Sequence, residues 1–219
     1  MDADTRVLIG IVGFTPVLDC YPLGPGLMSK LEASTWPDIA TTIENMSWGP
    51  LAIVQSLQAS RARHDRAVLI GAVQRGRPVG TVRGGVWRGG ALDPQLLQER
   101  IFEAVTGIVS LDNLLIIGEH FAVWPREVIT VEVELPRSCF GDLVVATDGG
   151  RGGAGDAEIE ARLSFRPSGV VDRIVALTRR AAVEGVAPGL ELEPRSAETL
   201  MPAEAFWRTD VAAISESGR

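Results

Sequence analysis

The stretch VLIGIVG, residues 7–13, decides the fold class. It is an uninterrupted run of aliphatic residues, rich in β-branched side chains, that ends at Gly13. A run of this kind is typical of a strand that is buried on both faces of a parallel sheet. A second run, AVLIGAV at residues 67–73, predicts another strand of the same type. The chain therefore contains at least two strands that need cover on both sides.

The segments between and after these strands have helical or strand patterns. The predicted helices span residues 26–32, 51–61, 93–105, 111–117 and 169–184, and two further predicted strands span residues 38–43 and 128–136. Asp93 and Pro94 are a typical N-cap and first helical residue, whereas the aliphatic content of 111–117 would also suit a strand. Because helices and strands alternate, the sequence predicts an α/β three-layer sandwich with a mostly parallel central sheet.

The predicted strand at 128–136 alternates between apolar and polar residues. Val131 and Val133 fall on one face, and Thr130, Glu132 and Glu134 fall on the other. Three other stretches are expected to lack regular packing. Residues 80–83 predict only a short edge strand before the glycine-rich residues 84–90, residues 148–156 predict a flexible insertion, and the polar residues 189–219 predict a tail or docking segment. The predicted α/β domain accordingly covers residues 1–188.

Composition excludes several functional classes. The formal net charge of −7, from 28 acidic and 21 basic residues, disfavours binding to nucleic acids or anionic membranes. Two cysteines are too few for a disulfide framework or a structural zinc site. The first residues lack a secretory signal pattern, so we expect a cytoplasmic protein. Phosphate-binding GxxxxGK[ST] loops and the G-x-S-x-G serine hydrolase motif are absent from the sequence.

Five stretches resemble, in order, the landmarks of the nickel-iron hydrogenase maturation endopeptidases. They are residues 7–31, 45–57, 68–82, 106–136 and 169–181, so that the resemblance extends over residues 7–185. This resemblance implies a hydrogenase maturation protease fold of the phosphorylase/hydrolase-like type. It also implies a protease that senses nickel in the hydrogenase large subunit and then removes a C-terminal extension from that subunit.

The same resemblance implies that two carboxylates and one histidine meet the metal at the ends of the strands. In this sequence the three ligand positions hold Cys20, Gly71 and Thr106, with Ala72 in place of Gly71 if the alignment gap moves by one residue. Glycine has no side-chain donor, and a threonine hydroxyl is a poor substitute for imidazole. The scaffold is therefore expected to be kept while the chemistry is lost.

A candidate site region follows from these positions. It comprises Asp19, Cys20, Asn45, Trp48, Gly49, Thr106 and Asp112, with His64 and His120 as weaker candidates. Asp112 matches a residue that the family keeps, and we expect it to have a structural role such as capping a helix. Cys20 is open to two interpretations, because it could be a nucleophile or soft-metal ligand activated by a histidine, or a small, half-buried residue in place of a lost acid.

Three functional hypotheses remain. The leading one is a non-proteolytic relative that binds a hydrogenase large-subunit precursor or an assembly factor, with no resident cofactor and with any nickel belonging to the partner. The alternative is an active metal-dependent processing endopeptidase with ligands from Asp19, Cys20 and either His64 or His120. The third is a structural subunit that docks through its C-terminal segment. Trp48 and Trp87 are expected on the ligand side of the sheet, as partner contacts or as plugs for loops.

Overall fold

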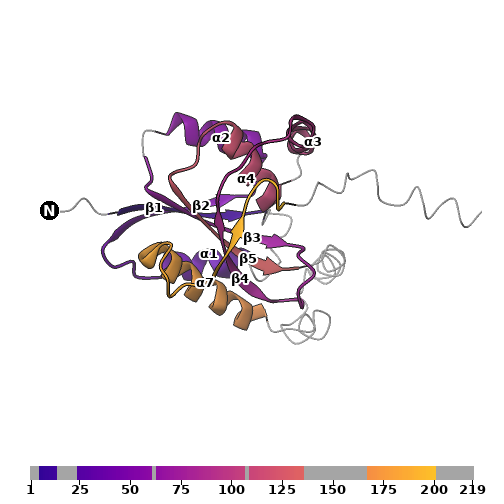
Figure 1. Cartoon of the computed structure of the whole chain (residues 1–219). Helices are drawn as coiled ribbons and strands as arrows, with labels where there is room; N and C mark the ends of the chain where they lie inside the picture. The colour runs from indigo at the N-terminus through magenta and orange to yellow at the C-terminus, as the bar shows by residue number, and fades with distance from the viewer. Residues whose placement is uncertain (1–4, 14–23, 61–62, 107–108, 136–166, 201–219) are drawn as a thin grey trace, which may run out of the picture.

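A computed structural model describes residues 5–13, 24–60, 63–106, 109–135 and 167–200 (Figure 1). The strands are β1 (Thr5–Val12), β2 (Ile39–Met46), β3 (Arg66–Val73), β4 (Val82–Trp87), β5 (Glu127–Glu134) and β6 (Leu192–Arg195). The helices are α1 (Gly24–Glu32), α2 (Pro50–Ala59), α3 (Pro94–Val105), α4 (Leu111–His120) and α7 (Pro167–Glu184). Residues 148–156, expected to form a flexible insertion, lie outside the described ranges.

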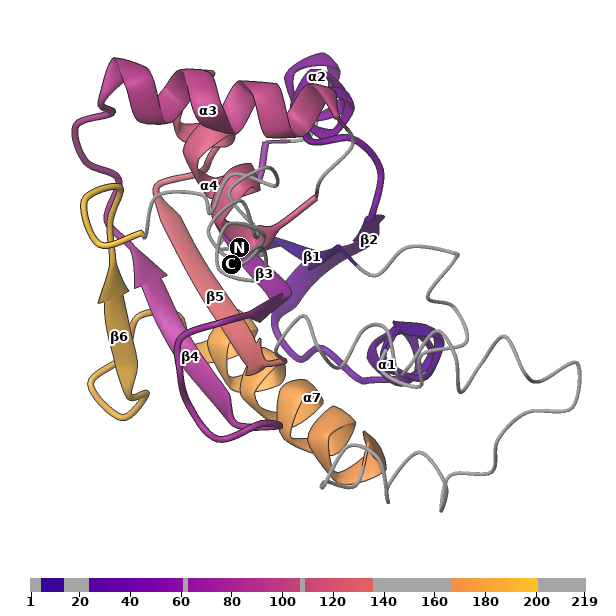
Figure 2. The same ribbon diagram turned by 90° about the vertical axis from the view of Figure 1, so that its right-hand side faces the viewer.

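The six strands form one mixed sheet in the order β2-β1-β3-β5-β4-β6. The pairs β1–β2, β1–β3 and β3–β5 are parallel, β4 is antiparallel to β5, and β6 is parallel to β4. The carboxyl ends of β1, β2, β3 and β5 therefore share one edge of the sheet, here called the carboxyl edge. Figure 2 looks onto this edge. The opposite edge, where these four strands begin, is called the amino edge.

Helices cover both faces of the sheet. Figure 1 shows α1 and α7 on one side and α2, α3 and α4 on the other. Along β1, Val7 and Ile9 pack in the core beneath α1 and α7, while Leu8 packs in the core beneath α2 and α4. Both faces of β1 and β3 are thus buried, which explains their continuous apolar sequences. The predicted three-layer α/β sandwich with a mostly parallel sheet is confirmed.

The expectation that residues 84–90 are too glycine-rich to pack regularly was wrong for residues 84–87. Strand β4 continues through Gly84 and Gly85 to Trp87 and lies inside the sheet, between β5 and β6. A Cβ atom on Gly84 would lie 2.6 Å from Leu192 Cδ2, and one on Gly85 would lie 2.4 Å from Thr130 Oγ1. The two glycines therefore let neighbouring side chains cross close to the β4 backbone.

Residues beyond 188 were expected to form a tail, and for residues 192–200 this was wrong. Leu192–Arg195 form β6, which pairs with β4 from Gly84 to Trp87. Beyond β6, Ala197 and Leu200 are buried in the core on the α4 side of the sheet. The α/β domain therefore includes this segment, and residues 201–219 lie outside the described ranges.

The other predicted elements agree with the structure apart from their ends. Strand β2 runs to Met46, three residues further than predicted, and α4 is a helix that continues to His120. Asp93 caps α3 by accepting hydrogen bonds from the amides of Gln95 and Leu96, as predicted. None of the helices in the described ranges is long and apolar enough to span a bilayer.

Helix α4 ends in a Schellman-type turn at a residue that is not glycine. The amide of Val123 donates to the carbonyl of Gly118 at 3.0 Å, and Ala122 has a φ of 51°. An L-residue in this left-handed conformation is strained by about 1 kcal/mol, and glycine relieves the strain.

We expect Ala122→Gly to stabilise the protein by about 0.5–1 kcal/mol, because the relief of strain exceeds the added entropy of the unfolded chain. Urea unfolding followed by circular dichroism measures this change. Ala176→Gly, at an exposed position inside α7, is the matched control and should destabilise by about 1 kcal/mol. A loss of stability in both variants would contradict the role assigned to residue 122.

Candidate functional site

Most of the predicted site residues lie at the carboxyl edge. Asn45 is near the end of β2, Trp48 and Gly49 lead into α2, Thr106 ends α3, and Asp112 is in the first turn of α4. In Figure 1, α3 is seen end-on beside the edge toward which these strands point. The predicted candidates Asp19 and Cys20 lie outside the described residues.

Gly71, which the sequence resemblance places at an expected ligand position, packs against helix α4. It lies on β3 between Val12 of β1 and Glu132 of β5. A Cβ atom built on Gly71 would lie 2.9 Å from Leu111 Cβ, a separation that real Cβ atoms almost never show. The absence of a side chain at this position thus allows α4 to begin directly against β3, and it leaves no room for a ligand side chain.

Thr106 uses its hydroxyl within its own helix. The hydroxyl donates a hydrogen bond of 2.7 Å to the backbone carbonyl of Glu103, one turn earlier in α3. Thr106 is exposed and is the C-cap residue of α3. A hydroxyl in this arrangement completes a helix end.

Asp112 does not cap α4, contrary to the expected capping role. Ser110 is the N-cap, and its side chain accepts a hydrogen bond from the amide of Asn113 at 3.1 Å. The Asp112 carboxylate instead accepts two hydrogen bonds from the Arg75 guanidinium, at 2.7 and 2.6 Å. This bidentate geometry is the strongest form of an arginine–carboxylate contact.

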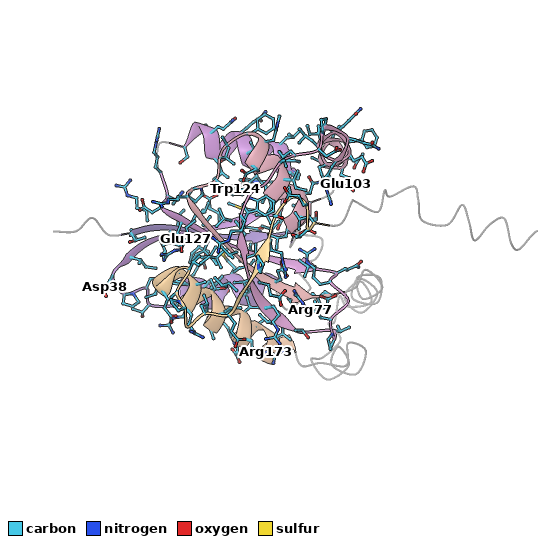
Figure 3. All side chains as sticks on the ribbon, in the orientation of Figure 1. Asp38, Arg77, Glu103, Trp124, Glu127 and Arg173 are labelled. Atoms are coloured by element: carbon cyan, nitrogen blue, oxygen red, sulfur yellow. The ribbon has the colours of Figure 1, made fainter. Side chains whose placement is uncertain are left out.

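The Arg75–Asp112 pair is one part of a larger group of charges at this end of the sheet. The arginine cluster, as we call it, consists of Arg75, Arg77, Asp112, Glu132, Glu193 and Arg195. Its members come from the loop after β3, the first turn of α4, the last third of β5, and β6. Segments far apart in the chain are therefore joined at one place. Figure 3 shows Arg77 toward the carboxyl edge and Glu127 at the opposite end of the sheet.

Glu132 lies at the centre of the arginine cluster. Its side chain is fully buried, and its two oxygens accept hydrogen bonds from Arg195 at 2.8 and 2.9 Å. Arg77 donates to the same carboxylate at 3.1 Å, and Arg75 donates to it at 3.3 Å. To reach Glu132, the Arg195 side chain crosses Gly85, whose Cβ would lie 3.1 Å from Arg195 Cγ.

A second buried acid fixes the loop that carries the arginines. The Glu134 carboxylate accepts hydrogen bonds from the backbone amide of Arg75 at 2.8 and 3.0 Å and from that of Gly76 at 3.0 Å. Glu134 is 3% exposed. The alternation predicted for β5 thus holds, but the face with the acidic residues points into a buried polar network.

The network controls the ionisation of its central group. Burial by itself raises the pKa of Glu132, but the hydrogen bonds from Arg195 and the charges of Arg75 and Arg195 outweigh burial. Together they lower the pKa of Glu132 from its ordinary value of 4.5 to about 2. Burial would lower the pKa of Arg75, but its bonds to Asp112 raise that pKa above the ordinary value. Both groups are therefore charged at neutral pH.

The described part of the carboxyl edge is poorly suited to hold a metal ion. Across the described ranges, no three His, Cys, Asp or Glu side chains are grouped as metal ligands. The nearby carboxylates of Asp112 and Glu132 are bonded to guanidinium groups. These permanent positive charges would repel a divalent cation. Gly71 and Thr106, which were expected at two of the ligand positions, have no side-chain donor and a hydroxyl bonded within its own helix, respectively.

The two histidines lie at the other end of the molecule. His64 is two residues before β3, and His120 is the last residue of α4, seven residues before β5 begins. Burial lowers the pKa of His64 below its ordinary value of 6.5, partly offset by Glu44. His120 is exposed, with its ring 4.9 Å from that of Phe121 in an edge-on arrangement. Both histidines are thus at the amino edge, away from the expected ligand positions.

Exposed apolar side chains border the carboxyl edge. Trp48 is 55% exposed, Phe102 is 51% exposed and Val105 is 69% exposed. Trp48 lies before the first turn of α2, and the other two lie in the last turns of α3. Trp87, which was predicted to share this surface with Trp48, is instead 7% exposed and belongs to the core.

The arginine cluster was not predicted from the sequence. A weak signal was present, because the predicted strand at 128–136 carried Glu132 and Glu134 on one face, and acids that become buried in a sheet require positive or amide partners. The loop after the 67–73 strand contains Arg75 and Arg77 as neighbours of that strand end. Arg195 could not be connected to them, because its segment had been assigned to a tail.

Comparison with known proteins gives similarities only at the level of solved structures. No protein-family profile and no curated protein sequence matches the chain. The structure is similar to a hydrogenase 3 maturation protease, with 14% identity over 88% of this chain and 98% of that protein and a TM-score of 0.42. It is also similar to an endopeptidase from Escherichia coli, with 14% identity over 85% and 96% and a TM-score of 0.44. A third similar structure is a hydrogenase 2 maturation peptidase from Thaumarchaeota archaeon SCGC_AB-539-E09, with 16% identity over 78% and 96% and a TM-score of 0.34.

We expect Gly71→Ala to destabilise the protein by about 1–3 kcal/mol, because the added methyl group must displace Leu111 and the start of α4. The midpoint of urea unfolding measures the change. Gly49→Ala is the matched control at the same edge, since a Cβ there meets no atom within 4 Å. Equal stability of wild type and Gly71→Ala would show that the contact with Leu111 is loose enough to admit a side chain.

We expect the stability that Glu132 provides to depend on pH. Its folded-state pKa of about 2 lies below the ordinary 4.5, so its contribution of about 3 kcal/mol is complete above pH ~5 and is lost as the pH falls toward 2. Glu132→Gln should therefore destabilise by about 3–5 kcal/mol at pH 7, and by less at pH 3. Urea unfolding at both pH values measures this difference.

The control for this experiment is Glu184→Gln, which removes one partner of the exposed Arg180–Glu184 pair. It should change stability by less than about 1 kcal/mol at either pH. A Glu132→Gln variant with the same deficit at pH 3 as at pH 7 would contradict the ionisation assigned to Glu132.

Proposed function

We propose that this chain is a non-proteolytic relative of the nickel-iron hydrogenase maturation endopeptidases. It would bind a protein partner, either a hydrogenase large-subunit precursor or an assembly factor, at the carboxyl edge of its sheet. The proposal starts from the five family landmarks that occur in order along residues 7–185. Any nickel in the complex would belong to the partner protein.

The absence of proteolysis is inferred from the described residues beside the end of β3, none of which offers a carboxylate to a metal ion. Gly71 has no donor atom and packs against Leu111, and the Asp112 and Glu132 carboxylates are held by Arg75, Arg77 and Arg195. A protease that positions itself on a metal needs carboxylate oxygens that face the ion. Removing the arginines from the buried Glu132 carboxylate and the half-buried Asp112 carboxylate would cost more than a weak metal contact returns.

Binding of a protein partner is inferred from the exposed apolar side chains that surround the carboxyl edge. Trp48, Phe102 and Val105 are large apolar side chains with at least half of their surface in contact with water. Exposed aromatic residues are enriched among the few positions that provide most of the affinity in protein interfaces. Trp48 lies just before α2, and Phe102 and Val105 lie on α3. All three border the carboxyl edge and would contact a partner placed over the strand ends.

We expect no cleavage when the purified protein is incubated with a nickel-loaded hydrogenase large-subunit precursor. The mass of the precursor, followed by intact-protein mass spectrometry, should still include the C-terminal extension. An active maturation endopeptidase that processes the same precursor is the positive control. Removal of the extension by this protein would refute the non-proteolytic reading and would support ligands from residues such as Asp19 and Cys20, with Cys20→Ser as the variant to test next.

We expect the Trp48→Ser/Phe102→Ser double variant to bind the precursor at least ~10-fold more weakly than wild type, because it loses two aromatic contacts of the carboxyl edge. Biolayer interferometry with immobilised precursor measures the affinity. Phe121→Ser/Val186→Ser is the matched control, since these residues are 38% and 43% exposed and lie at the amino edge. Equal losses in both double variants would place the partner elsewhere.

A further inference from the structure

Strand β2 is an edge strand of the sheet. It pairs with β1 along its whole length, and no strand of the described ranges pairs with its other side, here called the open side. Figure 2 shows β2 at one end of the strand order and β6 at the other. An edge strand presents a row of backbone donors and acceptors that can pair with a strand of another chain.

The hydrogen bonds to β1 show which backbone groups of β2 face the open side. The Gly13 amide donates to the Met46 carbonyl at 3.4 Å, so the backbone groups of Met46 point toward β1. Successive residues of a strand direct these groups to opposite sides, and the register with β1 is continuous along β2. Every second residue therefore directs its amide and carbonyl to the open side, namely Ile39, Thr41, Ile43 and Asn45. Among the described residues, no hydrogen bond reaches these groups.

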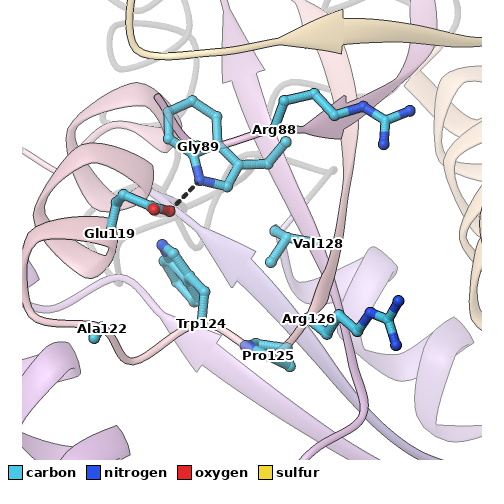
Figure 4. Close-up of a pocket in the computed structure, with 9 residues that line it drawn as sticks. Arg88, Gly89, Glu119, Ala122, Trp124, Pro125, Arg126 and Val128 are labelled. Atoms are coloured by element: carbon cyan, nitrogen blue, oxygen red, sulfur yellow. Dashed lines mark hydrogen bonds between the residues drawn. The ribbon is translucent and has the colours of Figure 1, made fainter. Parts of the chain in front are cut away.

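The two edge strands of the sheet differ in how they are protected from further pairing. Strand β6 has only four residues, and among them are Pro194, whose nitrogen cannot donate, and the charged Glu193 and Arg195. On that side of the sheet, Figure 4 shows a pocket in which the Trp87 indole at the end of β4 donates to Glu119 of α4 at 2.7 Å. Strand β2 has eight residues and contains no proline, lysine or arginine. Since short length, proline and charge are the usual protection of an edge strand, β2 is the side of the sheet that can accept another strand.

The backbone of β2 can pair with a second copy of itself. The register that uses the whole strand is antiparallel and places Thr42 opposite Thr42 of the second copy. In this register Thr41 lies opposite Ile43, and Ile39 lies opposite Asn45. All four of these residues direct their backbone groups to the open side, so each amide faces a carbonyl of the other copy. The pair is symmetric about a two-fold axis, as the interfaces of most homodimers are.

The side chains of β2 fit the same register. Glu44 is the only charged residue of β2, and it lies opposite Ala40 of the second copy, so the two Glu44 carboxylates do not meet. The two Thr42 side chains meet at the two-fold axis, and threonine pairs across neighbouring strands are favourable, whereas pairs of like charges are not. Ala40 and Thr42 are exposed. On the other face of β2, Ile39 and Ile43 are half-buried against the core beneath α1 and α7.

We propose that the open side of β2 is the interface of a homodimer, in which two antiparallel β2 strands join the sheets of two copies into one continuous sheet. A second copy is the occupant that pairs every backbone group of the open side and keeps the one charge of the strand away from a like charge. The contact uses the side of the sheet and not the ends of its strands, so this inference does not rest on the proposed function. Because a single strand pair makes a small interface, we expect a dissociation constant of about 1–100 µM.

The first test is the oligomeric state of the full chain in solution. Sedimentation equilibrium between about 1 and 200 µM should show a reversible monomer–dimer equilibrium in this range of concentration. A monomer at every concentration would overturn the proposal, even if β2 pairs with a strand of some other protein. Assembly beyond the dimer would also overturn it, because a symmetric pair of β2 strands leaves no open side for a third copy.

Thr41→Pro tests whether the open side of β2 forms the contact. We expect the dimer to dissociate at least ~10-fold more readily, because proline removes an open-side amide and places its ring against the second copy. The Thr41 amide points away from β1, so the hydrogen bonds between β1 and β2 remain, and thermal melting verifies that the variant is folded. An unchanged dimer would place the interface elsewhere and overturn the proposal.

Two substitutions at one exposed position test the register without affecting the backbone. Ala40→Lys should tighten the dimer at least ~3-fold at low salt, because each new ammonium group faces Glu44 of the second copy, and Ala40→Glu should weaken it at least ~3-fold. Ala176→Lys and Ala176→Glu are the matched controls at an exposed position of α7, and they should leave the dissociation constant within about twofold. Changes of equal size at Ala176 would show that the dimer responds to net charge only, and this result would overturn the assignment to β2.

Discussion

A fully buried glutamate is the constraint on which the rest of this structure depends. Glu132 is buried in the sheet with 0% exposure, and an unpaired carboxylate there would destabilise the fold by several kcal/mol. Its charge is compatible with folding because Arg75, Arg77 and Arg195 converge on it from the loop after β3 and from β6. Since each arginine is held in turn by another acid or by the backbone, one buried charge fixes the relative positions of elements that are more than a hundred residues apart.

This arrangement changes what the end of the sheet can do. In an open parallel sheet, the carboxyl ends of the strands form the usual place for ligands and catalytic groups. In this protein the carboxylates of Asp112 and Glu132 at the carboxyl edge are paired with arginines. Gly71, near the end of β3, packs against the first residue of α4. Three arginines and three acids of the arginine cluster balance one another at this end of the sheet. Trp48 and Val105 beside it are 55% and 69% exposed.

The sequence was most informative where one physical requirement dominates. The runs at 7–12 and 67–73 are apolar on both sides because helices cover both faces, and Asp93-Pro94 begins a helix for local reasons. Prediction failed where a residue acts through a distant partner. Gly84 and Gly85 suggested irregular packing, yet they make space for Leu192 and Arg195. Arg195, in a segment read as a tail, proved to be the main partner of Glu132. Pairings of this kind depend on tertiary packing that no local pattern contains.

Strand β6 also has a consequence for the order in which the protein is assembled. It is synthesised after every other described strand, yet it covers β4 and delivers Arg195 to Glu132. Until β6 has emerged from the ribosome, β4 is therefore an unpaired edge strand of the nascent sheet. At that stage Glu132 also lacks its ion pair with Arg195. Domains of this size can populate such partly formed intermediates. Emergence of β6 from the exit tunnel would then complete the described sheet.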